Sequence, residues 1–228
     1  MVQGARHEHD EALTEAAACL GLDLTVVPLR SAADVDDRLD ALVLPGGETT
    51  TMRLATEAGG LLSAVFAWIA AHPGRPVLGT CAGAILLAMP GEAHAPFVEV
   101  DVARNGWGRQ RASFEASVEV DLACPPPAAA TVAETHRLEG HRALPVGAPA
   151  SAWSVSGAAD GPMHGVFIRA PRFTSEPRRG RVVARLDGEP VGVLDGRRLA
   201  LTWHPELTAD RRMHRWLLAE AATAKDEA

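Results

Sequence analysis

A short apolar strand, a cysteine and a helix of small residues follow one another in segment 76–88, PVLGTCAGAILLA. This arrangement constrains the fold more than any other feature of the chain. Gly79, Ala82 and Gly83 leave little side-chain bulk around Cys81. A strand that passes into a helix through such a bare turn is typical of a nucleophile elbow, which exposes one side chain at the carboxyl edge of a sheet. The alternative is a buried structural cysteine, the usual role of a lone Cys.

The rest of the first half alternates between strands and helices. Apolar residues at helical spacing end at Gly21, a helix stop, and segment 61–72, LLSAVFAWIAAH, has a second helical pattern. Segments 24–29 and 41–45 are short apolar runs, as expected for buried strands. This rhythm predicts βαβ units. We therefore expect an α/β fold, a three-layer α/β/α sandwich with a mostly parallel central sheet and antiparallel edge strands.

The second half predicts the antiparallel strands. Segments 97–102 and 114–122 alternate between apolar and polar residues, as strands with one solvated face do. The pairs Asp187-Gly188 and Asp195-Gly196 stand where tight hairpins would turn. A final helix is expected from about residue 208, with a buried apolar stripe.

Composition limits the classes of protein that the chain can belong to. The chain has 228 residues and a net charge of -7, so we expect no nucleic-acid partner. No apolar run reaches the length of a membrane span, and the polar N-terminus is unlike a signal peptide. Three scattered cysteines predict neither a disulfide scaffold nor a metal site, and they favour a cytoplasmic protein. We expect one domain over residues 1–228, with an exposed insertion at 123–163, where Pro, Ala, Gly and Ser are frequent.

A thiol nucleophile requires a base, and the segment LTWHPEL supplies a candidate. His204 and Glu206 flank Pro205, which favours an extended chain in which both side chains point to the same side. Glu206 could then orient the His204 ring toward Cys81. A surface histidine before a turn is the alternative. The elbow and this segment together favour a catalytic triad of Cys81, His204 and Glu206.

Six segments together resemble the glutaminase subunits of pyridoxal 5'-phosphate synthase, which are class I (triad) glutamine amidotransferases. A GxCxG elbow with HPE would indicate only the broad class, whereas the combination is more particular. The resemblance covers most of the chain outside the insertion. The segments are Gln3-Gly4-Ala5, LPGGETTTMR, GTCAGAILLA, ARNGWGRQ followed by SFEA, GVFIRAP and HPELTAD.

The resemblance implies a role for each matching residue. Cys81 would attack the side-chain amide of L-glutamine, and the N–H groups of Gly47 and Ala82 would form the oxyanion hole. The turn at Gln3 and Gly4 would sense a partner protein. No cofactor and no metal are implied. The residues expected to hold glutamine are Gly47, Glu48, Thr49, Arg104, Ile168 and Arg169.

The resemblance also implies a partner, a (β/α)8-barrel synthase subunit that receives the ammonia for vitamin B6 biosynthesis. Relatives dock around a twelve-subunit core in a 12+12 hetero-oligomer. Three alternatives stay open: the glutaminase of another amidotransferase, a γ-glutamyl hydrolase, and a catalytically impaired binding subunit.

The third alternative comes from the N-terminus, where relatives have an apolar strand and this chain has only Met1-Val2. We expect this difference to expose neighbouring apolar surface and to lower stability. A start further upstream is the other interpretation.

Overall fold

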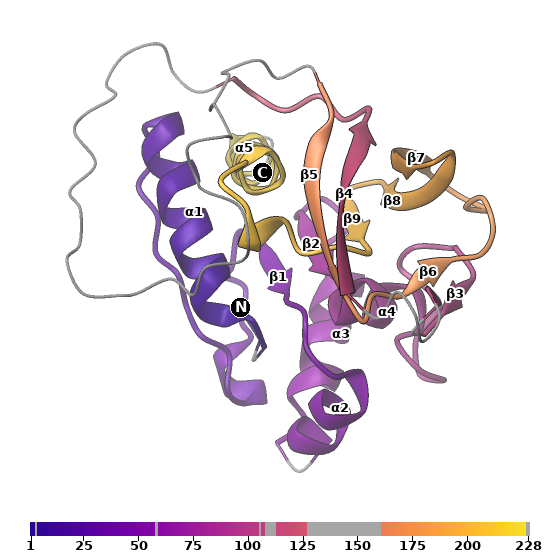
Figure 1. Ribbon diagram of the computed structural model, residues 1–228. Helices are drawn as coiled ribbons and strands as arrows, with labels where there is room; N and C mark the ends of the chain where they lie inside the picture. Colours follow the sequence, from indigo (N-terminus) through magenta and orange to yellow (C-terminus); the bar gives the residue numbers. More distant parts are fainter. Residues whose placement is uncertain (3, 58, 105, 108–112, 127–160, 227–228) are drawn as a thin grey trace.

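The computed structural model describes residues 1–2, 4–57, 59–104, 106–107, 113–126 and 161–226, and a seven-stranded sheet forms its centre (Figure 1). The order of the strands in this sheet is β1-β2-β9-β8-β7-β4-β5. The strands are β1 (Leu42–Leu44), β2 (Val77–Thr80), β4 (Ser113–Val120), β5 (Met163–Ile168), β7 (Arg181–Leu186), β8 (Glu189–Asp195) and β9 (Arg198–Leu201). A separate two-stranded sheet pairs β3 (Val102–Ala103) with β6 (Arg172–Phe173).

The parallel part of the sheet consists of β1, β2 and β9. In its register Leu44 lies opposite Gly79, and Thr80 lies opposite Leu201. The carboxyl ends of these three strands therefore meet at one edge. Both the elbow after β2 and the segment after β9 start from this edge.

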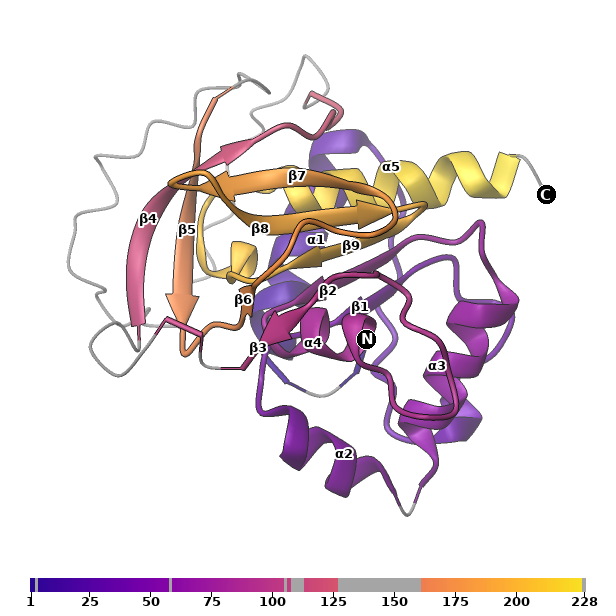
Figure 2. The ribbon, with the colours of Figure 1, turned by 90° about the vertical axis from the view of Figure 1, so that its right-hand side faces the viewer.

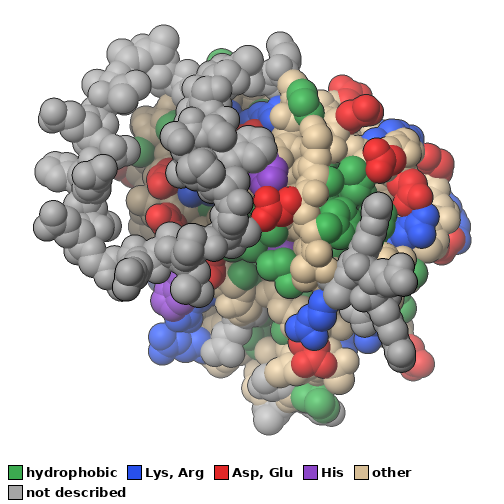
Figure 3. All heavy atoms as spheres, in the orientation of Figure 1, with side chains coloured by type: hydrophobic (Ala, Val, Ile, Leu, Met, Phe, Trp, Pro, Cys, Tyr) green, Lys and Arg blue, Asp and Glu red, His purple; other side chains and the backbone are tan. Residues whose placement is uncertain are grey.

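The remaining pairings of the sheet, from β9 through β8, β7 and β4 to β5, are antiparallel. The α/β class with parallel and antiparallel strands is confirmed, but the antiparallel part is larger than the edge strands that we expected. The hairpin at Asp187-Gly188 joins β7 to β8, and the turn at Gly196 joins β8 to β9, as predicted. In Figure 3 acidic and basic side chains are interspersed on the right of the molecule, where Figure 1 shows β7 and β8. The ion pairs near these strands include Arg185–Glu176 and Arg178–Asp101.

Two helical layers cover the opposite faces of the sheet, as Figures 1 and 2 show. Helices α1 (Arg6–Leu20) and α5 (Arg212–Asp226) pack against each other and on one face, in a core that includes Val43, Leu78 and Leu201. Helices α2 (Thr49–Glu57), α3 (Leu61–Ala71) and α4 (Ala82–Ala88) belong to the other side, where Leu42 and Leu44 point. Alternate side chains of β1 thus pack into the cores on opposite faces of the sheet, because successive residues of a strand point to opposite sides. Of the described helices, none has the length and hydropathy needed to cross a membrane.

Two predicted strands are wrong. Segments 24–29 and 97–101 contain no assigned strand. Residues 27–29 bond to the first residue of the chain: the Met1 nitrogen lies 2.8 Å from Val27 O, and Leu29 N–H donates to Met1 O. Segment 97–101 instead contacts helix α4, since Phe97 N–H donates to Leu87 O. Leu29 of the first segment and Val98 and Val100 of the second are buried although neither segment forms a strand ladder.

The expectation of exposed apolar surface around the N-terminus is wrong for the residues next to it. Met1 and Val2 are buried, and so are Leu29 and Leu42. Val2 N–H donates to Val43 O at 3.3 Å, so these two residues extend the pairing of β1. Val27 keeps 40% of its surface exposed.

The expected insertion at 123–163 is described only at its ends. Cys124 and Met163 are buried in the core of the α1 and α5 face, and Met163 is the first residue of β5. These two ends are therefore anchored rather than exposed. The interior, 127–160, lies outside the described residues, and the single-domain organisation stays a prediction.

Two glycines let helix α4 lie directly on the strands. A Cβ at Gly83 would lie 1.8 Å from Leu44 O, and one at Gly79 would lie 2.8 Å from the carbonyl carbon of Gly83. Real Cβ atoms do not approach backbone so closely, so any other residue would push α4 away from β1 and β2. Since α4 begins at the residue after Cys81, this contact fixes the position of the elbow.

We expect Gly83→Ala to lower the free energy of unfolding by about 3 kcal/mol, because the obstructing atom is backbone and has no other rotamer. Urea denaturation measures this change. Gly74→Ala is the matched control, since nothing lies within 4 Å of its added Cβ. Equal midpoints for the two variants would contradict the close approach of α4.

Candidate active site

Cys81 occupies a sharp turn between β2 and α4. Its backbone angles are φ 49° and ψ -104°, a conformation that residues other than glycine rarely adopt. The turn is held from both sides: Cys81 N–H donates to Leu201 O of β9 at 2.8 Å, and Ile85 N–H donates to Cys81 O at 3.3 Å. A strained cysteine between a strand and a helix has the geometry of a nucleophile elbow, as the sequence predicted.

His204 and Glu206 lie next to the elbow because β9 pairs directly with β2. The two residues follow β9, and both are buried, with 7% and 4% of their surface exposed. His204 N–H donates to Val166 O of β5, which fixes the backbone. The ring atom Nδ1 of His204 lies 2.7 Å from Glu206 Oε1, a short hydrogen bond.

The prediction of an extended chain through Pro205 is wrong, although the contact that it was meant to explain is present. Residues Pro205–Leu207 form a 3-10 turn, and Leu207 N–H donates to His204 O. Proline suits the first position of such a turn, because its φ is preset and it has no N–H to satisfy. The turn brings the Glu206 carboxylate within hydrogen-bonding distance of His204 Nδ1.

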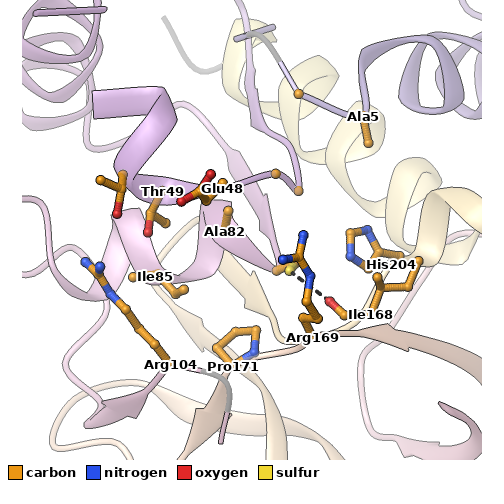
Figure 4. Close-up of a pocket in the computed structure, with 15 residues that line it drawn as sticks. Ala5, Glu48, Thr49, Ala82, Ile85, Arg104, Ile168, Arg169, Pro171 and His204 are labelled. Atoms are coloured by element: carbon orange, nitrogen blue, oxygen red, sulfur yellow. Dashed lines mark hydrogen bonds between the residues drawn. The ribbon is translucent and has the colours of Figure 1, made fainter. Parts of the chain in front are cut away.

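The pKa of His204 connects this ring to both neighbours. Burial alone would lower the pKa, but hydrogen bonds to Cys81 and Glu206, together with the negative charge of each, raise it to about 10. The contribution of Cys81 to this pKa indicates that the thiol and the ring are neighbours. The Cys81 thiol also lies 3.9 Å from Ile168 O, the contact marked by the dashed line in Figure 4. Cys81 and His204 line the same pocket, and Glu206 is hydrogen-bonded to His204.

A pocket of about 470 Å³ opens above Cys81 (Figure 4). Its walls are formed by residues that follow β2 and β5, by the N-terminal turn at Gly4 and Ala5, and by the start of α2. Every described residue that the sequence analysis placed at a substrate or oxyanion site lines it. The lining residues are Gly4, Ala5, Gly46, Gly47, Glu48, Thr49, Thr50, Cys81, Ala82, Ile85, Arg104, Ile168, Arg169, Pro171 and His204.

The charged residues of the pocket come from different segments. Glu48 precedes α2, and its Oε2 accepts a hydrogen bond from Thr51 at 2.6 Å. Arg104 follows β3, and Arg169 follows β5 with a positive φ of 44°. The pocket therefore offers one carboxylate and two guanidinium groups, and small residues such as Gly46, Gly47 and Ala82 form part of the rest of its lining. Such a set suits a small ligand that carries charges of both signs.

The N-terminal turn contacts the loop that carries Gly47. Ala5 N–H donates to Gly46 O at 3.1 Å, and a Cβ at Gly4 would lie 2.3 Å from that same oxygen. Gly4 also lines the pocket, and its predicted role in sensing a partner stays a prediction. Gln3 lies outside the described residues, so its predicted role stays a prediction.

Sequence reasoning missed several residues in and behind the site, among them Gly46 and a buried group next to Glu206. Gly46 is needed because a Cβ there would lie 2.3 Å from His204 Cε1, so the ring rests on bare backbone. The first glycine of the PGG segment was a usable signal for this contact. His9, Thr80 and His214 lie buried behind Glu206, and no spacing in the sequence connects them.

In the described part of the chain, no group of three or more His, Cys, Asp or Glu side chains is arranged to hold a metal ion. Cys19, Cys81 and Cys124 are all free thiols.

The model of the SNO glutamine amidotransferase family matches residues 1–131 and 153–223 of the chain. The chain belongs to this family. The unmatched residues 132–152 fall inside the expected insertion.

Among curated relatives, a protein of Methanosarcina mazei is 33% identical over 225 residues, which cover 95% of this chain and 94% of the relative. One of Bifidobacterium adolescentis is 36% identical, with 96% and 97% covered. Both are named pyridoxal 5'-phosphate synthase subunit PdxT.

Solved structures with a similar fold include a glutamine amidotransferase. A crystal structure of a glutamine amidotransferase has a TM-score of 0.69 and 32% identity, and 97% of each chain is covered. A putative GMP synthase protein from Thermoplasma acidophilum has a TM-score of 0.62 at 18% identity, with 99% of this chain and 92% of that chain covered, and it supports the fold alone. The fold class and the glutamine amidotransferase family, both predicted from the sequence, are confirmed.

The raised pKa of His204 predicts how stability depends on pH. A histidine whose pKa is about 10 in the folded chain and about 6.5 when unfolded contributes stability that is complete below pH 6.5 and is lost as the pH rises to 10. We expect the free energy of unfolding to fall over this window in the wild type and to fall less in His204→Gln. His7→Gln, which changes an exposed histidine of α1, is the control. Parallel pH profiles for the wild type and His204→Gln, measured by urea denaturation, would contradict the charge network.

Proposed function

We propose that the protein is a glutaminase that hydrolyses L-glutamine to L-glutamate and ammonia. The observation that carries this proposal is that Cys81 and His204 line one charged pocket while Glu206 is hydrogen-bonded to His204, in a member of the glutamine amidotransferase family. Each of the three groups has the partner that the chemistry requires. A thiol has a base, and the base has an orienting acid.

The geometry supports a two-stage mechanism. The Cys81 sulfur, after its proton passes to His204, attacks the side-chain carbonyl carbon of glutamine and forms a tetrahedral oxyanion. The N–H groups of Gly47 and Ala82 stabilise this oxyanion. His204 then protonates the amide nitrogen, the C–N bond breaks, and ammonia leaves behind a glutamyl thioester. His204 next takes a proton from water, whose oxygen attacks the thioester, and the C–S bond breaks to release glutamate and the thiol.

The charges of the pocket suit the backbone end of glutamine. A guanidinium fork donates two parallel hydrogen bonds to a carboxylate, so Arg104 and Arg169 are the groups proposed for the α-carboxylate. Glu48 is a matching group for the α-ammonium, with Thr49 beside it in the pocket wall. Ile168 lies against Cys81 through its carbonyl oxygen and completes the wall on the side of β5.

We further propose that the ammonia passes to a pyridoxal 5'-phosphate synthase subunit for vitamin B6 biosynthesis. Support comes from the name shared by the relatives, which describes one subunit of that synthase. The partner is proposed to be a (β/α)8 barrel in a 12+12 assembly, with the turn at Gln3 and Gly4 as the sensing element. The contact between Gly4 and Gly46 gives this turn a route to the oxyanion loop. A cytoplasmic location, where thiols stay reduced, suits a cysteine nucleophile.

The proposal is tested by measuring ammonia release from glutamine with and without the synthase subunit. We expect Cys81→Ala to lower the rate at least about 1,000-fold, because the nucleophile is lost. Cys19→Ala, which changes a half-buried thiol of α1, is the control. Hydrolysis that Cys81→Ala leaves intact would defeat the mechanism.

The same assay separates the alternatives. Hydrolysis without stimulation by the synthase subunit would point to another amidotransferase or to a γ-glutamyl hydrolase. A wild type that binds the synthase subunit but releases no ammonia would point to an impaired binding subunit.

Arg169→Gln is expected to raise the KM for glutamine about 10- to 100-fold, since a charge-assisted hydrogen bond contributes about 1.5–3 kcal/mol. Steady-state kinetics measure this change. Arg38→Gln is the control, because the side chain of Arg38 is 90% exposed and lies outside the pocket. Equal KM values for the two variants would remove Arg169 from the substrate site.

A further inference from the structure

A pair of histidines lies beneath the candidate triad, on the side away from the pocket. His9 of α1 and His214 of α5 are both completely buried. His9 Nδ1 lies 3.0 Å from His214 Nε2, and His9 Nε2 lies 3.1 Å from Thr80 Oγ1. Thr80 is the residue directly before Cys81. Buried polar groups are costly unless they are hydrogen-bonded, so this arrangement requires a physical reason.

The reason lies in the second oxygen of Glu206. Oε1 of this carboxylate accepts a hydrogen bond from His204, whereas Oε2 is buried and has no regular hydrogen bond within the described residues. His9 Nε2 lies 3.4 Å from Oε2. A buried carboxylate oxygen without a donor is expensive, and a hydrogen on His9 Nε2 would supply one.

The hydrogen bond between the histidines allows two arrangements of protons. Burial lowers the pKa of both rings, so each is neutral and carries one ring hydrogen. In the first arrangement His214 Nε2–H donates to His9 Nδ1, and His9 carries its hydrogen on Nε2, facing Thr80 and Glu206. In the second, His9 Nδ1–H donates to His214 Nε2, and His9 Nε2 presents a lone pair to Glu206.

The surroundings distinguish these two arrangements. His214 Nδ1 is buried and has no hydrogen-bond partner among the described residues. The second arrangement would place a hydrogen on this atom and would also leave Glu206 Oε2 without a donor. The first arrangement leaves only a lone pair on His214 Nδ1, which is the smaller cost, since orphaned N–H groups are rare in proteins.

We propose that His9 is a positioning residue for the candidate triad, held by His214 in the tautomer whose Nε2–H is directed toward Thr80 Oγ1 and Glu206 Oε2. Oε1 of Glu206 is then hydrogen-bonded to His204, and Oε2 has the N–H of His9 beside it, with the two heavy atoms 3.4 Å apart. His9 does not line the pocket and acts only through Glu206. The inference rests on the proposed function, because the property that His9 serves is the orientation of the base for Cys81.

The tautomer of His9 is measured directly in the wild-type protein. Long-range ¹H–¹⁵N correlation spectra of the histidine rings distinguish a protonated ring nitrogen from an unprotonated one. We expect a neutral His9 with its hydrogen on Nε2 and a neutral His214 with its hydrogen on Nε2. A His9 signal with the hydrogen on Nδ1 would overturn the proposal, whatever the activity of the protein.

The role of His9 is measured with a pair of matched variants. His9→Gln keeps an amide N–H close to the position of Nε2, whereas His9→Asn places its amide near Nδ1. Two rates are followed, the alkylation of Cys81 by iodoacetamide and the hydrolysis of glutamine. We expect His9→Asn to lower the alkylation rate and kcat about 10- to 100-fold with KM changed less than about 3-fold, since misplacement by about 1 Å costs about 100-fold. We expect His9→Gln to recover most of both rates.

Controls separate this role from plain destabilisation. His7→Gln, in the same helix but exposed, should leave both rates unchanged, and thermal unfolding shows whether each variant is folded. Equal rates in His9→Asn and His9→Gln, with both folded, would overturn the positioning role. If the wild type releases no ammonia from glutamine, the proposed function fails, while the alkylation rates and the tautomer still decide the role of His9.

Discussion

The close approach of helix α4 to strand β1 is the contact on which the rest of the site depends. Gly83 and Gly79 allow backbone to lie against backbone, and this leaves the chain no relaxed path between β2 and α4. Cys81 consequently adopts a positive φ, and its N–H is directed to β9. Strain of this kind persists only where surrounding contacts over-determine the conformation. Here the sheet on one side and the helix on the other do so.

The features predicted correctly from sequence are those that local chemistry determines. The bare elbow around Cys81, the Asp-Gly hairpin and the apolar stripe of α5 each depend on neighbours in the chain, and all three are present. The strand expected at 24–29 is absent because a strand requires a partner, and the partner is set by the whole fold. The 3-10 turn after His204 shows the same limit on a smaller scale, since proline there permits either an extended chain or a tight turn.

The group behind Glu206 could not be found in the sequence at all. His9 and His214 stand 205 positions apart, each in an amphipathic helix, where a single polar residue on the buried face looks like a local irregularity. Their contact depends on how α1 packs against α5, which no sequence period encodes. Buried polar networks of this type cost free energy when incomplete and define one arrangement when complete. The core between the sheet and these two helices therefore combines apolar packing with a row of polar side chains, His214, His9 and Glu206, that reaches His204 at the pocket.

The order of the strands in the sheet also determines when the site can form during synthesis. Strand β9 is synthesised after the other described strands, yet it lies between β2 and β8, provides the acceptor for Cys81 N–H and leads into His204. A nascent chain with only its first half folded lacks the base and the contact that locks the turn. Its cysteine then has no histidine beside it, so the site is complete only after β9 has joined the sheet.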